Sequence, residues 1–80
     1  MTQYFFDFRS GDLVSVDDEG QELANIDMVH REAVEALADA LQDFVTEGCL
    51  NQHIAINVRD QVGLVLEVSA ILQSKIVRKQ

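Results

Sequence analysis

Apolar and polar residues alternate with a period of two near the N-terminus, which predicts a half-buried β-strand. One face of this strand would carry Tyr4, Phe6 and Phe8, and the other face Phe5, Asp7 and Arg9. A turn is expected at residues 10–12, because serine, glycine and aspartate favour turns. The segment LVSVDD then alternates again, with Val14 and Val16 on one face, so the chain is predicted to begin with a β-hairpin. A second turn is predicted at residues 17–20.

The period changes to three and four residues between positions 26 and 47, which predicts one long amphipathic helix. Asn25 precedes it where an N-cap is expected, and Gly48 follows it where a glycine commonly ends a helix. The apolar side of this helix would consist of Ile26, Val29, Ala33, Leu37, Ala40, Leu41 and Phe44.

Alternation returns after the helix and predicts a second hairpin, with strands at residues 54–58 and 64–68 and a turn at residues 60–63. The order ββαββ indicates an α+β two-layer sandwich, in which one long helix covers one face of a four-stranded, mainly antiparallel sheet. Residues 1–73 would form a single domain, and residues 74–80 a basic C-terminal tail.

The predicted sheet has one face covered by the helix and one face open. Tyr4, Phe6 and Phe8 are expected to pack against the helix. Phe5 points to the open face, and exposed apolar groups can mark an association surface. The leading hypothesis is therefore a non-enzymatic interaction module that binds a protein partner or itself, as a homodimer, through the open face or the sheet edges. The candidate interaction residues are Phe5, Arg9, Arg59, Val65 and Ile71.

Length and charge narrow the classes of function. The 80 residues have room for one core, and the formal net charge of −8 repels phosphate backbones, so direct nucleic-acid binding is not expected. No window approaches the roughly 18 apolar residues of a membrane span, so neither a membrane partner nor export is expected and the cytoplasm is the expected location. A single cysteine cannot form an intramolecular disulfide. Three of the six lysine and arginine residues lie in the tail, which is suited to docking on an acidic surface.

Two stretches, YFFDFRSGD at residues 4–12 and DDEGQEL at residues 17–23, resemble a family of short uncharacterised bacterial domains. Members of that family begin with a strand and turn like Y-F-F-[D/H]-x-R-x-G-D and continue with a segment like D-x-E-G-x-E-L. The helix that begins in ANIDMVHREAVEAL and the hairpin AINVRDQVGLVLEV extend the resemblance over nearly the whole chain, while Ala24 stands where the family often has proline. The resemblance implies a shared fold and carries no activity, substrate, cofactor or site residue.

Several groups of residues could bind a metal ion or take part in catalysis, or could have a structural role alone. The acidic residues of segment 12–22 supply oxygen ligands for a divalent cation, but their spacing does not match an EF-hand loop, so a divalent-cation-binding domain is the alternative to a solvated acidic turn. A second alternative, an antitoxin-like regulatory domain, rests on fold analogy. His30 is expected to be partly buried on the apolar side of the helix, and Cys49 with His53 falls short of the four ligands of a closed zinc site. No catalytic motif is present, so no enzyme activity, cofactor or resident metal is expected.

Overall fold

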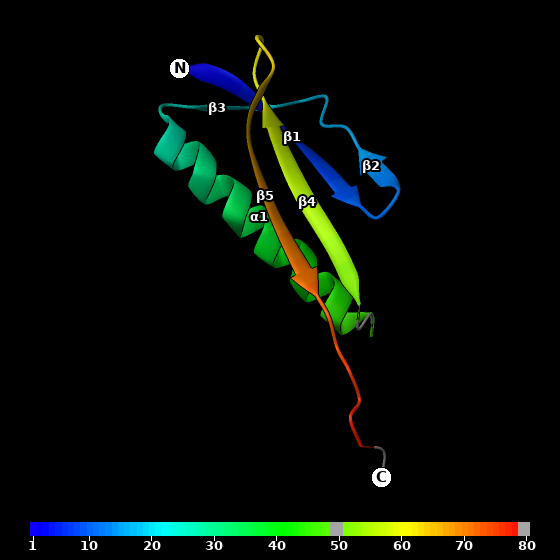
Figure 1. Ribbon diagram of the computed structural model, residues 1–80. Coiled ribbons are helices and arrows are strands. Elements are labelled where there is room, and N and C mark those ends of the chain that lie inside the picture. Colours follow the sequence, from blue (N-terminus) through cyan, green and yellow to red (C-terminus); the bar gives the residue numbers. More distant parts are fainter. Residues whose placement is uncertain (49–50, 79–80) are drawn as a thin grey trace.

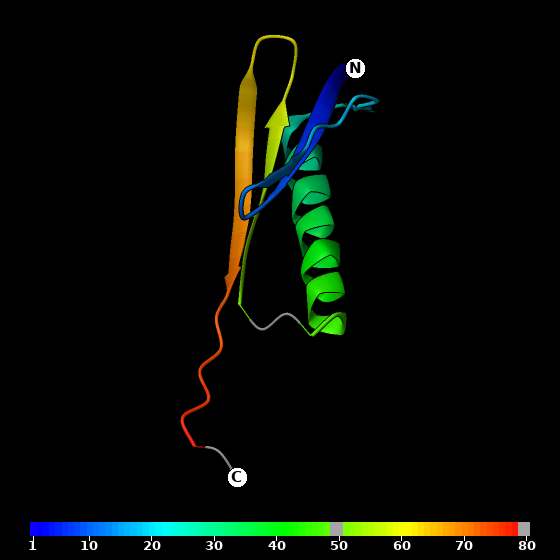
Figure 2. The same cartoon turned by 90° about the vertical axis from the view of Figure 1, so that its right-hand side faces the viewer.

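The computed structural model describes residues 1–48 and 51–78 and has the predicted α+β architecture. One helix packs against one face of an antiparallel sheet, as Figures 1 and 2 show. In chain order the elements are β1 (Thr2–Ser10), β2 (Leu13–Ser15), β3 (Gln21–Leu23), α1 (Ile26–Thr46), β4 (Gln52–Arg59) and β5 (Leu64–Leu72). Both hairpins and the long helix are confirmed.

Over the residues that the structure describes the sheet has five strands, and the prediction of four was wrong. Its order is β2-β1-β4-β5, and β3 also pairs with β1. β1 is therefore an inner strand: β4 pairs along one of its edges, while β2 and β3 pair with opposite ends of the other edge. β3 escaped prediction because its three residues are too few to display a period of two.

The core lies between α1 and the inner strands. Its fully or nearly fully buried side chains belong to Leu23, Val29, Ala33, Ile56 and Val58. Tyr4, Phe6, Phe8, Leu37, Leu66 and Val68 pack against this group and are partly buried, so the predicted aromatic face of β1 does point to the helix side. Each fully buried aliphatic side chain stabilises the fold by about 1.5 to 3 kcal/mol, and a small domain depends on every one of them.

The helix begins and ends where capping chemistry predicts. The Asn25 side chain accepts a hydrogen bond from the Met28 N–H at 3.0 Å, and Gly48 takes a positive φ of 83° after the last turn. His30 is exposed, so the prediction that it would be partly buried was wrong. The buried stripe follows Val29 and Ala33, and His30 lies about 100° around the helix from Val29.

Residues 73–78 continue past the end of β5 and away from the rest of the domain (Figures 1 and 2). All six of these residues are exposed, and they include Lys75 and Arg78. Within residues 1–48 and 51–78 no helix is long and apolar enough to cross a membrane.

Candidate functional site

The most highly connected polar groups lie where β2 and β3 leave a gap along the edge of β1. β2 pairs with β1 as far as Ser15 opposite Phe8, and β3 resumes with Gln21 opposite Tyr4. Residues 16–20 therefore lie opposite residues 5–7, two residues more on the outer segment than on β1. We call segment 16–20 the bulge, because extra residues in one strand of an antiparallel pair leave backbone groups of the other strand without a strand partner.

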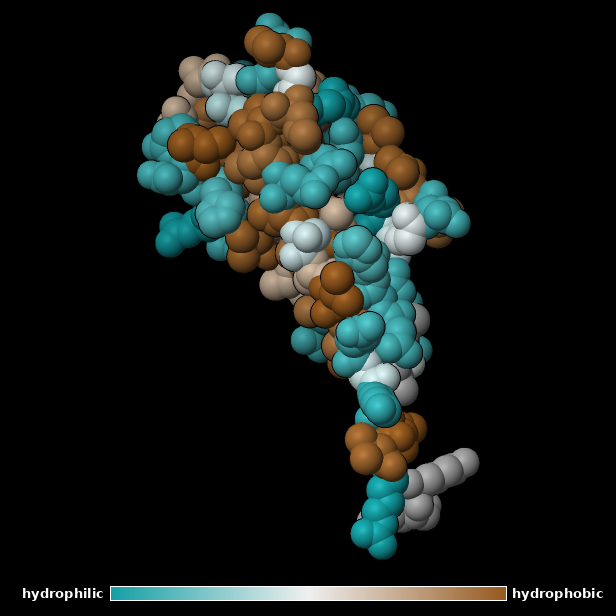
Figure 3. All heavy atoms as spheres, viewed as in Figure 1, coloured by the Kyte–Doolittle hydropathy of each residue, from teal (hydrophilic) through white to brown (hydrophobic). Residues whose placement is uncertain are grey.

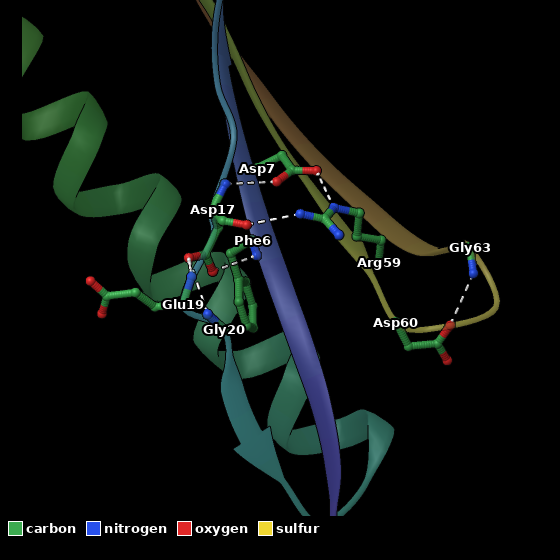
Figure 4. Close-up of polar contacts among 8 residues, drawn as sticks. All are labelled: Phe6, Asp7, Asp17, Glu19, Gly20, Arg59, Asp60 and Gly63. Atoms are coloured by element: carbon green, nitrogen blue, oxygen red, sulfur yellow. Dashed lines mark hydrogen bonds and ion pairs between the residues drawn. The ribbon is translucent and has the colours of Figure 1, made fainter.

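Asp17 takes the place of the missing strand partner. Its Oδ2 accepts a hydrogen bond from the Phe6 N–H at 3.0 Å, as Figure 4 shows. Its Oδ1 accepts from the N–H groups of Glu19 at 3.1 Å and Gly20 at 3.2 Å, which folds the bulge into a tight turn. One carboxylate thus satisfies three backbone donors.

Arg59 and Asp7 connect the bulge to the centre of the sheet. Arg59 Nε donates a hydrogen bond to Asp7 Oδ2 at 2.9 Å, and Arg59 Nη2 donates one to the backbone carbonyl oxygen of Asp17 at 2.8 Å. The other oxygen of Asp7 accepts from the Asp17 N–H at 2.9 Å. The two aspartates and the guanidinium (Figure 4) form a closed set of charge-assisted hydrogen bonds between β1, β4 and the bulge.

Phe5 is the apolar part of the same site. The guanidinium carbon of Arg59 lies 4.5 Å from the centroid of the Phe5 ring, within the range of a cation–π contact. Gly20 has φ +76°, and a Cβ built on it would lie 2.9 Å from the Phe5 ring. The ring therefore fits between the guanidinium and the backbone of the bulge. We call Phe5, Asp7, Asp17, Gly20 and Arg59 the bulge cluster.

Electrostatics favour the charged form of Asp17. The hydrogen bond from the Phe6 N–H lowers the pKa of the Asp17 carboxyl most strongly, burial acts in the opposite direction, and the Gly20 and Glu19 N–H groups and the Arg59 charge lower it further. The net pKa is below the ordinary value of 3.8.

This pKa shift predicts a specific loss of stability in acid. A carboxyl whose pKa is lower in the folded state stabilises the fold above its unfolded pKa, and this stabilisation is lost as the pH falls through the folded pKa. The stability difference between the wild type and Asp17→Asn should therefore be constant from pH 7 to about 5 and shrink below about 4. Urea unfolding of both proteins across this pH range measures it, and a difference that grows in acid would contradict the assignment.

The structure brings Phe5 and Arg59 into contact and places Val65 next to Arg59 in the register, so three of the five predicted interaction residues lie at one end of the sheet. Phe5 and Arg59 lie opposite each other on β1 and β4, whereas Arg9 lies opposite Ala55. Ile71 lies opposite His53, six residues along β4 from Arg59, which is about 20 Å. Val65 lies at the other end of β5, beside the irregular pairing of Val58 and Arg59. The five residues therefore form no single patch on one copy of the chain, and their role in interaction stays a prediction.

Sequence reasoning missed Asp7, Asp17 and Gly20 as members of a site. The acidic segment was interpreted as a solvated turn or a cation ligand set, but both oxygens of Asp17 already accept backbone hydrogen bonds. Among the residues that the structure describes, no three His, Cys, Asp or Glu side chains lie close enough together to hold a metal ion. Cys49 lies outside the described residues, so its pairing with His53 stays untested.

Comparison with known proteins gives one match. The family model described as a domain of unknown function, DUF6894, matches residues 3–71 and so includes every strand residue from Gln3 to Ile71 and the whole bulge cluster. No curated protein and no solved structure matches the chain.

Proposed function

The chain belongs to the family of the domain of unknown function DUF6894, and we propose that it is a non-catalytic interaction module whose partner adds a β-strand to the β5 edge of the sheet. The observation that carries the proposal is the contrast between the two edges of the sheet. One edge consists of two three-residue strands separated by the bulge, and the other is a single nine-residue strand with one irregular pairing step at Val65.

The edge formed by β2 and β3 has features that natural sheets use to prevent pairing with other chains. Each of these strands has three residues, and the bulge separates them. In the gap between them the Asp17 carboxylate accepts the hydrogen bond of the Phe6 N–H, which is then not available to another chain. Short edge strands, bulges and charged groups all oppose edge-to-edge pairing.

The β5 edge has fewer of these features: it is one nine-residue strand, with a single irregularity in its pairing with β4 at Val65. β5 has nine residues, LVLEVSAIL, of which Glu67 is the one charged residue, and it contains no lysine or proline. It is the last strand of the order β2-β1-β4-β5, and among the residues that the structure describes no strand pairs with its outer side. In Figure 3 hydrophobic side chains recur between polar ones along the line of β5. A long apolar edge with free N–H and C=O groups is the surface that β-strand addition uses.

A peptide with the sequence of residues 64–72 and a lysine at each end tests this proposal. In hydrogen–deuterium exchange mass spectrometry, at a protein concentration low enough for the chain to be monomeric, the peptide should slow amide exchange in β5 and leave β2 and β3 unchanged. A matched peptide in which every backbone N–H is methylated should give no protection, because neither of its edges can donate hydrogen bonds to β5. Absence of binding, or protection outside β5, would contradict the proposal.

A further inference from the structure

The sequence of β5 is self-complementary when two copies of the strand run antiparallel. Given the proposed use of the β5 edge, on which this inference rests, we infer that the added strand is β5 of a second copy of this chain. The two copies would form a two-fold symmetric homodimer centred on Val68, with one continuous sheet.

Symmetry leaves few registers to choose from. In an antiparallel pair, two opposite residues direct their N–H and C=O groups either both toward the partner strand or both away from it. Two copies of one strand can therefore change register only in steps of two residues. In each allowed register the two-fold axis passes through one residue, which lies opposite its own copy. Centring on Glu67 would place two like charges directly opposite each other, which is destabilising. Centring on Val68, the middle of the nine residues, places Glu67 opposite Ser69 of the second copy and brings all nine residues into the pair, including the irregular step of β5 at Val65.

The same register places apolar groups opposite apolar groups. Val65 lies opposite Ile71 of the second copy, and Leu64 lies opposite Leu72. Ile71 is 68% exposed and Leu64 69% exposed in the single chain, so pairing covers side chains that the fold itself leaves in water. Val65 and Ile71, which lie at opposite ends of β5 on one copy, become cross-strand neighbours. The two-fold axis is perpendicular to the sheet, so both helices cover the same face.

Charge also favours this arrangement at the ends of the pair. Two chains of formal net charge −8 repel each other, so opposite charges near the interface are needed to offset the repulsion. The affinity of the two copies should also rise with salt concentration, because salt screens this repulsion. Beyond Leu72 residues 73–78 continue along the line of β5 (Figure 2), and in the dimer they run toward the β4–β5 turn of the second copy. Lys75 then approaches Asp60, the one charged residue of turn 60–63.

Charges introduced at Ser69 test the register, with sedimentation velocity across a concentration series as the measurement. Ser69→Glu places a glutamate opposite Glu67 twice per dimer and should weaken the dimer about tenfold, whereas Ser69→Lys should tighten it by a similar factor. Gln42→Glu and Gln42→Lys are the matched controls, because Gln42 is exposed on α1 and these variants change the net charge equally. Equal effects at Ser69 and Gln42 would overturn the register.

Cysteine cross-linking gives an independent readout. In a Cys49→Ser background, Val68→Cys should form a disulfide-linked dimer on mild oxidation, because residues opposite each other in an antiparallel pair have Cα atoms about 4.5 to 5.5 Å apart. Val65→Cys should not, because its two copies lie about 20 Å apart in this register. A wild type that is monomeric at every concentration would overturn the homodimer. If the peptide of residues 64–72 still protected β5 in that case, strand addition would stand and the partner would be another protein.

Discussion

Replacing Gly20 with alanine should lower the melting temperature of the domain by about 10 to 30 °C. Gly20 has φ +76°, which costs a residue with a Cβ about 1 kcal/mol. The new Cβ would also lie 2.9 Å from the Phe5 ring, which the Arg59 guanidinium contacts, and 2.9 Å from the Gln3 side-chain nitrogen, so both side chains must move and their contacts weaken. Together these effects are worth about 2 to 4 kcal/mol, and a domain of this size loses about 4 to 8 °C per kcal/mol.

Gly11→Ala is the control for the backbone contribution. Gly11 has φ +57°, but a Cβ there meets nothing within 4 Å, so we expect a loss of about 1 kcal/mol from the backbone alone. Thermal unfolding followed by circular dichroism compares the two variants. Combining Gly20→Ala with Phe5→Ala should cost less than the sum of the single changes, because the part of the clash that involves the ring disappears while the contact with Gln3 remains. Equal losses at Gly20 and Gly11, or strict additivity with Phe5, would contradict the packing of the ring against the bulge.

The elements predicted correctly are those whose signals are local and repeated. The helix was predicted to within a residue because a periodic pattern over more than five turns is bounded by an N-cap at Asn25 and a glycine at position 48. β1, β4 and β5 each have eight or nine residues, which is long enough for alternation to show. His30 was misplaced because periodicity gives a broad apolar face, whereas burial depends on where the sheet contacts it.

The bulge cluster could not be predicted from the sequence, because its members meet only through the register in which β1 pairs with β2, β3 and β4. Asp7, Asp17 and Arg59 are separated by ten and forty-two residues, and their meeting depends on two extra residues between β2 and β3. A local signal did exist in DDEG, because an aspartate three residues before a glycine is suited to an Asx-type turn. That signal predicts a turn and does not identify the β1 edge as the place where the carboxylate binds.

The apolar residues of the open face illustrate the same limit. Alternation placed Phe5, Val65 and Ile71 on one face, and the register then separated Ile71 from Phe5 by about 20 Å. The β5 edge is therefore a better candidate surface than the open face, because no strand within residues 1–48 and 51–78 pairs with its outer side. Self-complementarity of LVLEVSAIL is visible in the sequence, but it becomes informative once β5 is known to be an edge strand.

Asp17→Ala should lower the free energy of unfolding at pH 7 by about 2 to 3 kcal/mol. The change leaves the Phe6 N–H in the part-buried gap of the sheet without its acceptor and removes the two hydrogen bonds that fold the bulge. This loss of unfolding free energy is larger than the loss expected on removing an exposed helix-capping residue. Water can hydrogen-bond to an exposed N–H that has lost its acceptor, but it reaches the part-buried Phe6 N–H less easily. Urea unfolding monitored by circular dichroism measures the difference.

Asp18→Ala is the matched control, because Asp18 is the exposed neighbour of Asp17 and makes no side-chain hydrogen bond among the residues that the structure describes. It removes the same charge from the same acidic segment and should change the free energy of unfolding by less than about 0.5 kcal/mol. Amide exchange at Phe6 should accelerate in Asp17→Ala and stay unchanged in Asp18→Ala, because the Asp17 carboxylate is the acceptor for that N–H. If the two variants were equally stable, the acidic segment would act through its net charge, and the bulge would not hold β2 and β3 against β1.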